Sequence, residues 1–176
     1  MFNMKKVSKL IIGIGGNINS SDGMHPTEVG KNVIKKLETL SIKVLKASSW
    51  YKSDPIPKSE QPKFFNCVIF ATTFLNEIGV LKNLHLLETF YGRIRNEINE
   101  PRIIDLDLID FSGIVYKSDK LVLPHPRAHL RRFVMEPLAE LDPFWVHPVI
   151  NLSAQEIVLK LKDQNVTIYE QHKIID

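Results

Sequence analysis

The sequence predicts an α+β fold built around a largely antiparallel sheet. Strand-like and helix-like patterns come mixed along the 176 residues, and several of the connections between them have the length of a hairpin. No repeat, low-complexity tract or long linker divides the chain. We therefore expect a single domain over residues 1–176.

The composition is typical of a soluble protein with a buried core. Apolar residues make up 44% of the chain and charged residues 24%, which is close to the globular average. The net charge of +3 is too small to indicate a nucleic-acid partner. No apolar run approaches the roughly 20 residues that a membrane span needs. We expect a cytoplasmic monomer that binds neither nucleic acid nor a membrane.

Hydrophobic periodicity predicts the elements of the first half of the chain. VSKLIIGIGG is typical of a strand that ends in a glycine turn, and KNVIKKLETL places its apolar residues at helical spacing. KSDPIPKSEQPK is a polar loop with three prolines. In chain order we expect a strand over 7–16, a loop over 20–30, a helix over 31–40, a strand over 42–51, a loop over 52–63 and a strand over 64–74.

The second half of the chain is assigned in the same way. GVLKNLHLLETFYG carries apolar residues on one helical face and ends at a glycine, and SAQE is a capping box. We expect a helix over 79–92, a strand within 100–111, a strand that turns at its prolines over 113–126, a helix through 133–141 and a last short helix from 153.

Two carboxylates stand out within the strand EPRIIDLDLIDF. Because successive side chains of a strand point to opposite faces, Asp105 and Asp107 share one face, while the apolar residues around them share the other. Asp110 is expected on that opposite face, near the end of the strand. The two like charges either bridge divalent ions such as Mg²⁺ or lie on a solvated face beside lysines and arginines.

Positive residues flank this strand on both sides. Arginine matches phosphate oxygens two at a time, and histidine adds a donor, so an acidic pair between such residues is typical of a phosphoryl-transfer site. The alternative is a set of ordinary surface arginines. The residues are Arg93, Arg95 and Arg102 before the strand, and His125, Arg127, His129, Arg131 and Arg132 after it.

A third group lies in SDPIPKSEQPKFFNCV. Asn66 interrupts an apolar strand, and its amide offers both a donor and an acceptor to the edge of a flat heterocycle. Phe64 or Phe65 could stack on the face of such a ring. Each of these residues also has a purely structural interpretation, as core aromatics and as an asparagine that caps a backbone group.

Several other chemistries are excluded. GIGGNI lacks the third glycine of the dinucleotide fingerprint, since Ile18 stands there, and no Walker-type motif occurs. The single cysteine, Cys67, excludes an intramolecular disulfide and a cysteine-only zinc site. Its apolar neighbours favour a buried, inert thiol. Phosphates would have to be held by arginines and metal ions.

Four segments together carry a resemblance to one enzyme family. GIGGNI, SSWYKSDPIPKSEQPKFFN, ETFYGRIRNEINEPRIIDLDLIDF and LPHPRAHLRRFVMEPLAEL occur in its order and spacing, between about residues 10 and 145. The chain resembles 6-hydroxymethyl-7,8-dihydropterin pyrophosphokinase, a folate-pathway family. The resemblance implies a ferredoxin-like α/β sandwich with a central four-stranded antiparallel sheet flanked by helices. It also implies transfer of a pyrophosphoryl group from ATP to the hydroxymethyl group of the pterin, with release of AMP.

The resemblance further implies roles for residues on the ATP side. Asp105 and Asp107 match the ligands of two Mg²⁺ ions that clamp the cosubstrate ATP, and Asp107 is also a candidate general base. Catalytic contacts with the phosphates are implied for Arg93, Arg95, Arg102, His125 and Arg131, and further ATP-side positions for Glu88 and Lys120.

On the pterin side, Phe64 and Phe133 match two aromatic plates that hold the ring between them. Asn66 matches the side chain that reads the pterin edge, while Ser53 and Ile56 would offer backbone groups to it.

The chain departs from the family in places. NEPR stands where members commonly have W-G-P-R, so the loop 94–101 offers no tryptophan as a lid. GGN replaces the commoner G-S-N after the first strand. The loop 19–31 and the tail 151–176 carry no assigned role.

Two other classes of protein fit part of this pattern. A nucleic-acid-binding ferredoxin-like module would use arginines and aromatic residues, but carboxylates beside them would repel the phosphate backbone. A two-metal phosphohydrolase would use the same aspartates and would release phosphate or pyrophosphate without a pterin acceptor.

Overall fold

A computed structural model of the chain describes residues 6–93 and 100–171 and confirms the α+β class. The elements are β1 (Ser8–Gly16), α1 (Pro26–Leu37), the 3₁₀ turn η1 (Glu38–Leu40), β2 (Ile42–Ala47), β3 (Trp50–Ser53), β4 (Phe64–Thr73), α2 (Glu77–Phe90), β5 (Asp105–Phe111), β6 (Tyr116–Lys117), β7 (Val122–Leu123), the 3₁₀ turn η2 (Ala128–Leu130), α3 (Arg132–Leu141), α4 (Ala154–Lys160) and β8 (Val166–Glu170). Of the described helices, none is long and apolar enough to cross a bilayer.

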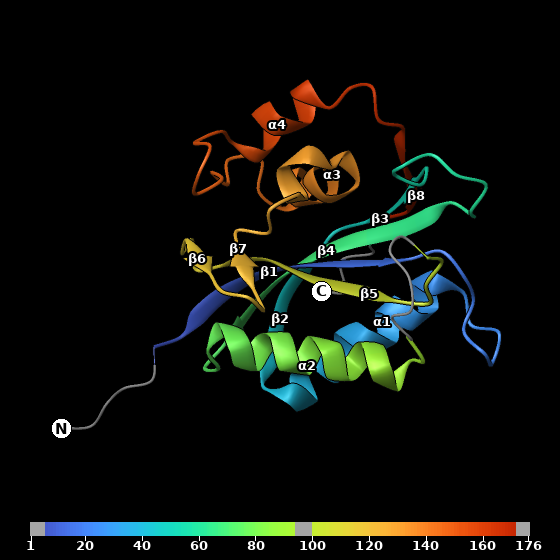
Figure 1. Cartoon of the computed structure of the whole chain (residues 1–176), viewed down its shortest axis with the longest axis horizontal. Coiled ribbons are helices and arrows are strands. Elements are labelled where there is room, and N and C mark those ends of the chain that lie inside the picture. Colours follow the sequence, from blue (N-terminus) through green and yellow to red (C-terminus); the bar gives the residue numbers. More distant parts are fainter. Residues whose placement is uncertain (1–5, 94–99, 172–176) are drawn as a thin grey trace.

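Figure 1 shows three layers, with α3 and α4 on one face of the sheet and α1 and α2 on the other. The strand order is β5-β1-β4-β3-β8, β2 also pairs with β4, and every pairing is antiparallel. This sheet has six strands instead of the expected four. Since β2 and β3 pair successive parts of β4, the central positions are β5, β1, β4 and the β2–β3 column, and β8 adds an edge that the sequence did not indicate.

Alternation along β1 divides the core into two clusters. Leu10, Ile12 and Ile14 pack toward α1 and α2, whereas Ile11 packs toward α3 and α4. The next residues on the α3 side of β1 are glycines, so the cluster on that side stops short and the sheet is left uncovered there. This gap becomes the floor of the site.

Three local features differ from the expectations. α1 begins at Pro26 instead of residue 31, because a proline is well accommodated in the first turn and the His25 ring accepts a hydrogen bond from the Thr27 amide. The strand expected over 42–51 is broken between β2 and β3. A bulge in β5 places Asp110 opposite Ile11, so Asp110 lies on the face of Asp107 and not on the opposite one.

The contact between α1 and Trp50 leaves no room for a side chain at Gly30. A Cβ atom built at Gly30 would lie 2.2 Å from the Trp50 ring. We expect Gly30→Ala to lower the free energy of unfolding by about 1–3 kcal/mol, although alanine favours a helix, because overpacking outweighs the propensity gain. Urea denaturation measures this effect. The exposed Lys35→Ala on the same helix serves as the control, and a Gly30→Ala protein as stable as the parent would contradict the packing.

Candidate active site

A cleft of about 210 Å³ opens on the α3 side of the sheet. Its floor is formed by β1 and β4, one wall by β5 and the segment before it, and the other by the segment that leads into α3. The lining includes Gly13, Gly15, Asp54, Ile56, Phe64, Asn66, Cys67, Arg93, Arg102, Asp105, Asp107, His125, Arg127, Arg131 and Phe133. Ten of the residues expected at the site are thus brought together from five separate stretches of sequence.

The floor of the cleft is a row of backbone without side chains. Across the β1–β5 pair, Gly15 lies opposite Asp105 and Gly13 lies opposite Asp107. Across the β1–β4 pair, Gly15 lies opposite Asn66. Asp105 and Asn66 are therefore two strand spacings apart, roughly 10 Å, with only a glycine between them. Glycine inside a strand marks a close approach to the backbone, which fits two ligands that meet over β1.

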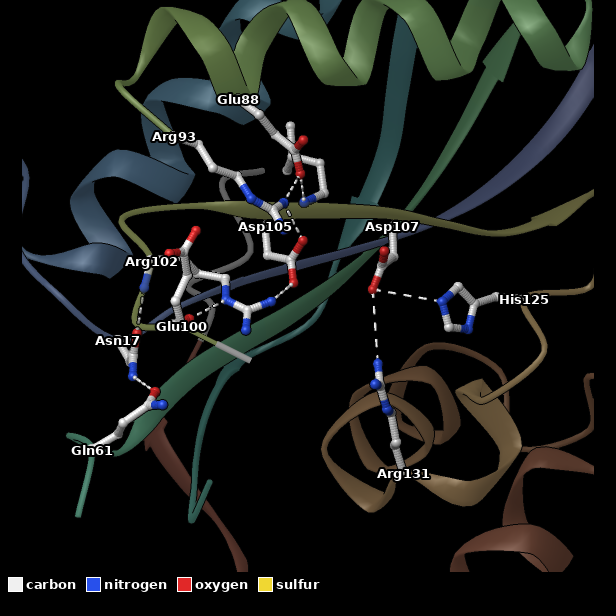
Figure 2. Close-up of polar contacts among 11 residues, drawn as sticks. Asn17, Gln61, Glu88, Arg93, Glu100, Arg102, Asp105, Asp107, His125 and Arg131 are labelled. Carbon is white, nitrogen blue, oxygen red and sulfur yellow. Dashed lines mark hydrogen bonds and ion pairs between the residues drawn. The ribbon is translucent and has the colours of Figure 1, made fainter. Parts of the chain in front are cut away.

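Asp105 is bound by two guanidinium groups (Figure 2). Arg93 contacts both Asp105 and Glu88 of α2, and Arg102 donates to the other oxygen of Asp105 at 2.7 Å. The Glu88 carboxylate also accepts from the Leu106 amide at 2.8 Å. Burial alone would raise the pKa of Asp105, but the two guanidinium groups hold that pKa below its usual range.

Asp107 has a different environment. Among the described residues, its ion-pair partners are distant: His125 Nε2, on a neutral ring, lies at 3.9 Å and an Arg131 nitrogen at 4.0 Å. Burial and the charge of Asp105 raise the pKa of Asp107 to about 6. Two carboxylates on one strand face thus differ, since one is neutralised by close pairing and the other is weakly paired.

His125 enters the cleft as a neutral ring. Its Nδ1 accepts from the Arg127 amide at 3.2 Å, which leaves the proton on the Nε2 that faces Asp107. Burial and the charges of Arg131 and Arg127 lower the pKa of His125 to about 4. At neutral pH, His125 can therefore donate a hydrogen bond to a phosphate but adds no charge.

The opposite half of the cleft can hold a flat ring. Asn66 donates to Ser53 Oγ at 2.9 Å, which fixes the orientation of its amide. Phe64 and Phe133 both line the cleft, whereas Phe65 points to the other side of the sheet and packs on His25. Of the two phenylalanines considered from sequence, only Phe64 is placed to stack on a ligand.

Phe64 and Phe133 each lie beside an arginine of the phosphate-binding half of the cleft. The Arg102 guanidinium carbon is 5.6 Å from the Phe64 ring centroid, and that of Arg131 is 5.6 Å from the Phe133 ring. Cation–π contact at this range links the aromatic and the charged halves of the cleft.

Several expected site residues have other positions. Glu88 is buried behind Arg93 and does not line the cleft, so its carboxylate supports the arginine, and the ATP-side role that the resemblance implies stays a prediction. Lys120 is exposed on the β6–β7 turn, away from the cleft lining. The Ser53 hydroxyl accepts a hydrogen bond from the Asn66 amide, so Ser53 orients Asn66 by its side chain. Arg95 lies outside the described residues. Cys67 is buried as expected, and burial raises the pKa of its thiol to about 12.

Two residues to which the resemblance gives no role contribute to the site. Arg127 lines the cleft beside His125. Asn17, directly after β1, accepts from the Arg102 amide at 2.8 Å and donates to Gln61 and Pro62 at 3.2 Å (Figure 2). It thereby joins the loop before β4 to the segment before β5. The asparagine after a strand-end glycine was the only sequence signal for this role.

A cleft in an α+β domain that combines carboxylates, guanidinium groups and aromatic side chains is typical of one class of protein, the enzymes that transfer phosphoryl groups to small molecules. The family model of 7,8-dihydro-6-hydroxymethylpterin-pyrophosphokinase matches residues 11–143. The chain belongs to this family.

Relatives agree with this assignment, and a solved structure agrees with the fold. The chain is 30% identical over 165 residues to a 2-amino-4-hydroxy-6-hydroxymethyldihydropteridine pyrophosphokinase of Haemophilus influenzae, covering 93% of this chain and 94% of that one. It is 33% identical over 168 residues, 94% of this chain, to the folic acid synthesis protein of Schizosaccharomyces pombe, but spans only 22% of its length. A Plasmodium falciparum HPPK-DHPS structure matches the fold with a TM-score of 0.71 at 13% identity, covering 90% of this chain and 46% of that chain.

The contrast between the two aspartates predicts opposite effects on stability. Asp107→Asn removes a weakly paired charge, so the melting temperature without ligands should rise by about 2–4 °C, after allowing for the 36% exposure of the side chain. Asp105→Asn removes the carboxylate that pairs with Arg102 and that shares Arg93 with Glu88, and should lower it by roughly 5 °C.

The gain of Asp107→Asn depends on pH with a definite sign. The pKa of Asp107 is raised in the folded state, so its charge opposes folding above about pH 6 and not below the unfolded value of 3.8. The gain should be complete at pH 7.5 and disappear as the pH falls toward 4. Thermal unfolding in a chelator tests both variants, and a shift of the same sign for the two would contradict the assignment.

Proposed function

We propose that this chain transfers an intact diphosphoryl group from ATP to the hydroxymethyl oxygen of 6-hydroxymethyl-7,8-dihydropterin, giving AMP and the pterin diphosphate, in folate biosynthesis. The observation that carries the proposal is the glycine floor between Asp105 and Asn66. It leaves space over β1 where a phosphate chain on the β5 side and a heterocycle on the β4 side could meet. Membership of the family supports the same reaction.

Asp105 and Asp107 would hold two Mg²⁺ ions. Mg²⁺ is commonly bound by one or two carboxylates together with substrate phosphates and water, and the donor set here fits that preference. No group of three or more metal-ligating side chains gathers in the described part of the chain, and a site shared with a nucleotide needs none. When bound, the ions would withdraw charge from the phosphates and lower the pKa of the alcohol.

Guanidinium groups of the cleft would hold the triphosphate. Arg102, Arg127 and Arg131 line the cleft from two sides, and the weakly paired Asp107 leaves the charge of Arg131 available for an anion. Planar guanidinium groups bind phosphate oxygens in pairs and stabilise charge that moves onto the leaving group. Arg95 belongs to the same proposal by its position in the sequence.

The pterin would lie between Phe64 and Phe133. The Asn66 amide, held by Ser53, presents its oxygen as an acceptor for the N–H groups at the ring edge. Ile56 closes the same end of the cleft from the proline-rich loop. In this orientation the hydroxymethyl group points over Gly15 toward Asp105.

The reaction is a displacement at phosphorus. The hydroxymethyl oxygen attacks the β-phosphorus of ATP and forms a new P–O bond, while the bond from that phosphorus to the oxygen bridging the α-phosphorus breaks. AMP leaves with the electron pair, and the alcohol proton passes to water or to Asp107, the candidate base. The protein contributes alignment and charge compensation.

The proposal extends to the organisation of the protein. Residues 1–176 would act as one catalytic domain and as a monomer in the cytoplasm, without a nucleic-acid partner. The two core clusters share a single sheet, which supports one folding unit.

Loss of either carboxylate should abolish transfer. Asp105→Ala or Asp107→Ala should reduce turnover by about 10²-fold or more, since each removes a ligand of the ions that compensate the phosphate charge. AMP formation with ATP, Mg²⁺ and hydroxymethyldihydropterin measures this, with circular dichroism to verify folding. Near-normal turnover in either folded variant would overturn the metal assignment.

The acceptor dependence separates the proposal from its rivals. AMP should form only when the pterin is present. Release of phosphate or pyrophosphate from ATP alone would favour a two-metal phosphohydrolase. Tight RNA binding with steep salt dependence and no Mg²⁺-dependent ATP binding would favour a nucleic-acid module.

A further inference from the structure

Glu140, near the C-terminal end of α3, is bound to the break between β2 and β3. Its carboxylate accepts hydrogen bonds from the Ser49 amide at 3.0 and 3.1 Å, from the Ser49 hydroxyl at 3.0 Å and from the Tyr51 hydroxyl at 2.8 Å. A negative charge at this end of a helix is opposed by the helix dipole. The contacts with the sheet therefore hold a residue that its own helix disfavours.

At this break the Ser49 amide donates to a side chain of α3 and not to a neighbouring strand. Its neighbour Ser48 still pairs with Val68 of β4 through backbone and side chain, at 2.9 and 3.0 Å. Ser49 instead donates to Glu140, and the ladder with β4 resumes at Tyr51. α3 thus supplies the acceptor that a neighbouring strand would otherwise provide to the Ser49 amide, and the direction in which β3 continues depends on this contact.

β3 carries this link to the ring-binding half of the cleft. Tyr51 lies opposite Asn66 across the β3–β4 pair, and Ser53 lies opposite Phe64. Tyr51 is only 6% exposed, and burial together with the hydrogen bond to Glu140 raises its pKa, so the hydroxyl stays protonated as a donor.

α3 carries the link to the second plate. Phe133 precedes Glu140 by seven residues, which is close to two helical turns, so both side chains fall on nearly the same face about 10 Å apart along the axis. Phe133 reaches the cleft at one end of the helix while Glu140 contacts the sheet at the other. The Glu140 contacts therefore fix where α3, and with it Phe133, lies relative to β3 and β4.

We propose that Glu140 is a positioning residue that sets the width of the slot between Phe64 and Phe133 and the placement of Asn66 within it. The inference rests on the proposed function, because the slot is assigned to the pterin. It identifies Glu140, Ser49 and Tyr51 as determinants of affinity for the ring, although none of the three lines the cleft.

The test compares binding of the two substrates. Affinity for hydroxymethyldihydropterin is measured by fluorescence titration with Mg²⁺ and a saturating non-hydrolysable ATP analogue, and affinity for the analogue by calorimetry. Glu140→Ala should raise the pterin Kd by about tenfold and Tyr51→Phe by about threefold, with the analogue Kd within about twofold of the parent, because a small displacement of a plate is costly at the ring alone. The pterin KM should rise more than kcat falls.

Two further variants sharpen the comparison. Glu140→Gln should restore most of the pterin affinity, since its amide oxygen accepts from Ser49 and its amino group can donate to the Tyr51 oxygen. Glu38→Ala removes the same charge from an exposed residue on the other side of the sheet, and should change neither Kd.

The outcomes are distinct. A Glu140→Ala protein with a lower melting temperature and an unchanged pterin Kd would reduce Glu140 to a brace of the fold and overturn the proposal. Should Glu140→Ala fail to fold, an unchanged pterin Kd in Tyr51→Phe would overturn it. A parent protein that binds the ATP analogue but no pterin would contradict the proposed function itself. The comparison of variants with the parent tests only the role of Glu140.

Discussion

The close pairing of Asp105 with Arg93 and Arg102 is the interaction on which the site depends. Two carboxylates on one face of β5 repel each other, and burial increases the cost of both charges. The two guanidinium groups resolve this at Asp105, and Glu88 holds Arg93 from behind. Asp107 is then left as the weakly paired acid. The same cluster of charges thereby offers carboxylates to cations and guanidinium groups to phosphates. When a nucleotide binds, phosphate oxygens and cations would replace the ion pairs between these side chains.

The glycine floor adds a steric constraint to this electrostatic one. A Cβ atom at Gly15 would lie 3.1 Å from the Asn66 amide oxygen. The backbone of β1 therefore passes close to the ring-binding half of the site. Because β1 is the strand between β5 and β4, it is also the only place where the carboxylates and Asn66 could be brought next to each other without intervening side chains.

Sequence reasoning succeeded where the signal was local and failed where it depended on distant partners. Alternation placed Asp105 and Asp107 correctly on one face, since the leucines beside them are buried. It failed at Asp110, because a bulge depends on the pairing with β1. β8 was missed since VTIYE is a short edge strand whose middle residues stay exposed. Glu88 was placed on the nucleotide side by its match to the family, and the sequence alone could not show that its side chain lies behind Arg93.

The same distinction explains why Glu140 could not be found from sequence. A glutamate in the last turn of a helix is indistinguishable from a solvated residue until the break between β2 and β3 is known, and that break lies about ninety residues earlier in the chain. The position of Glu140 in the sequence does not show which donor it binds, and the position of Ser49 does not show which acceptor its amide contacts. Only the fold brings the two together. A carboxylate that joins α3 to the sheet by four hydrogen bonds is well placed to control how the two walls of the site face each other.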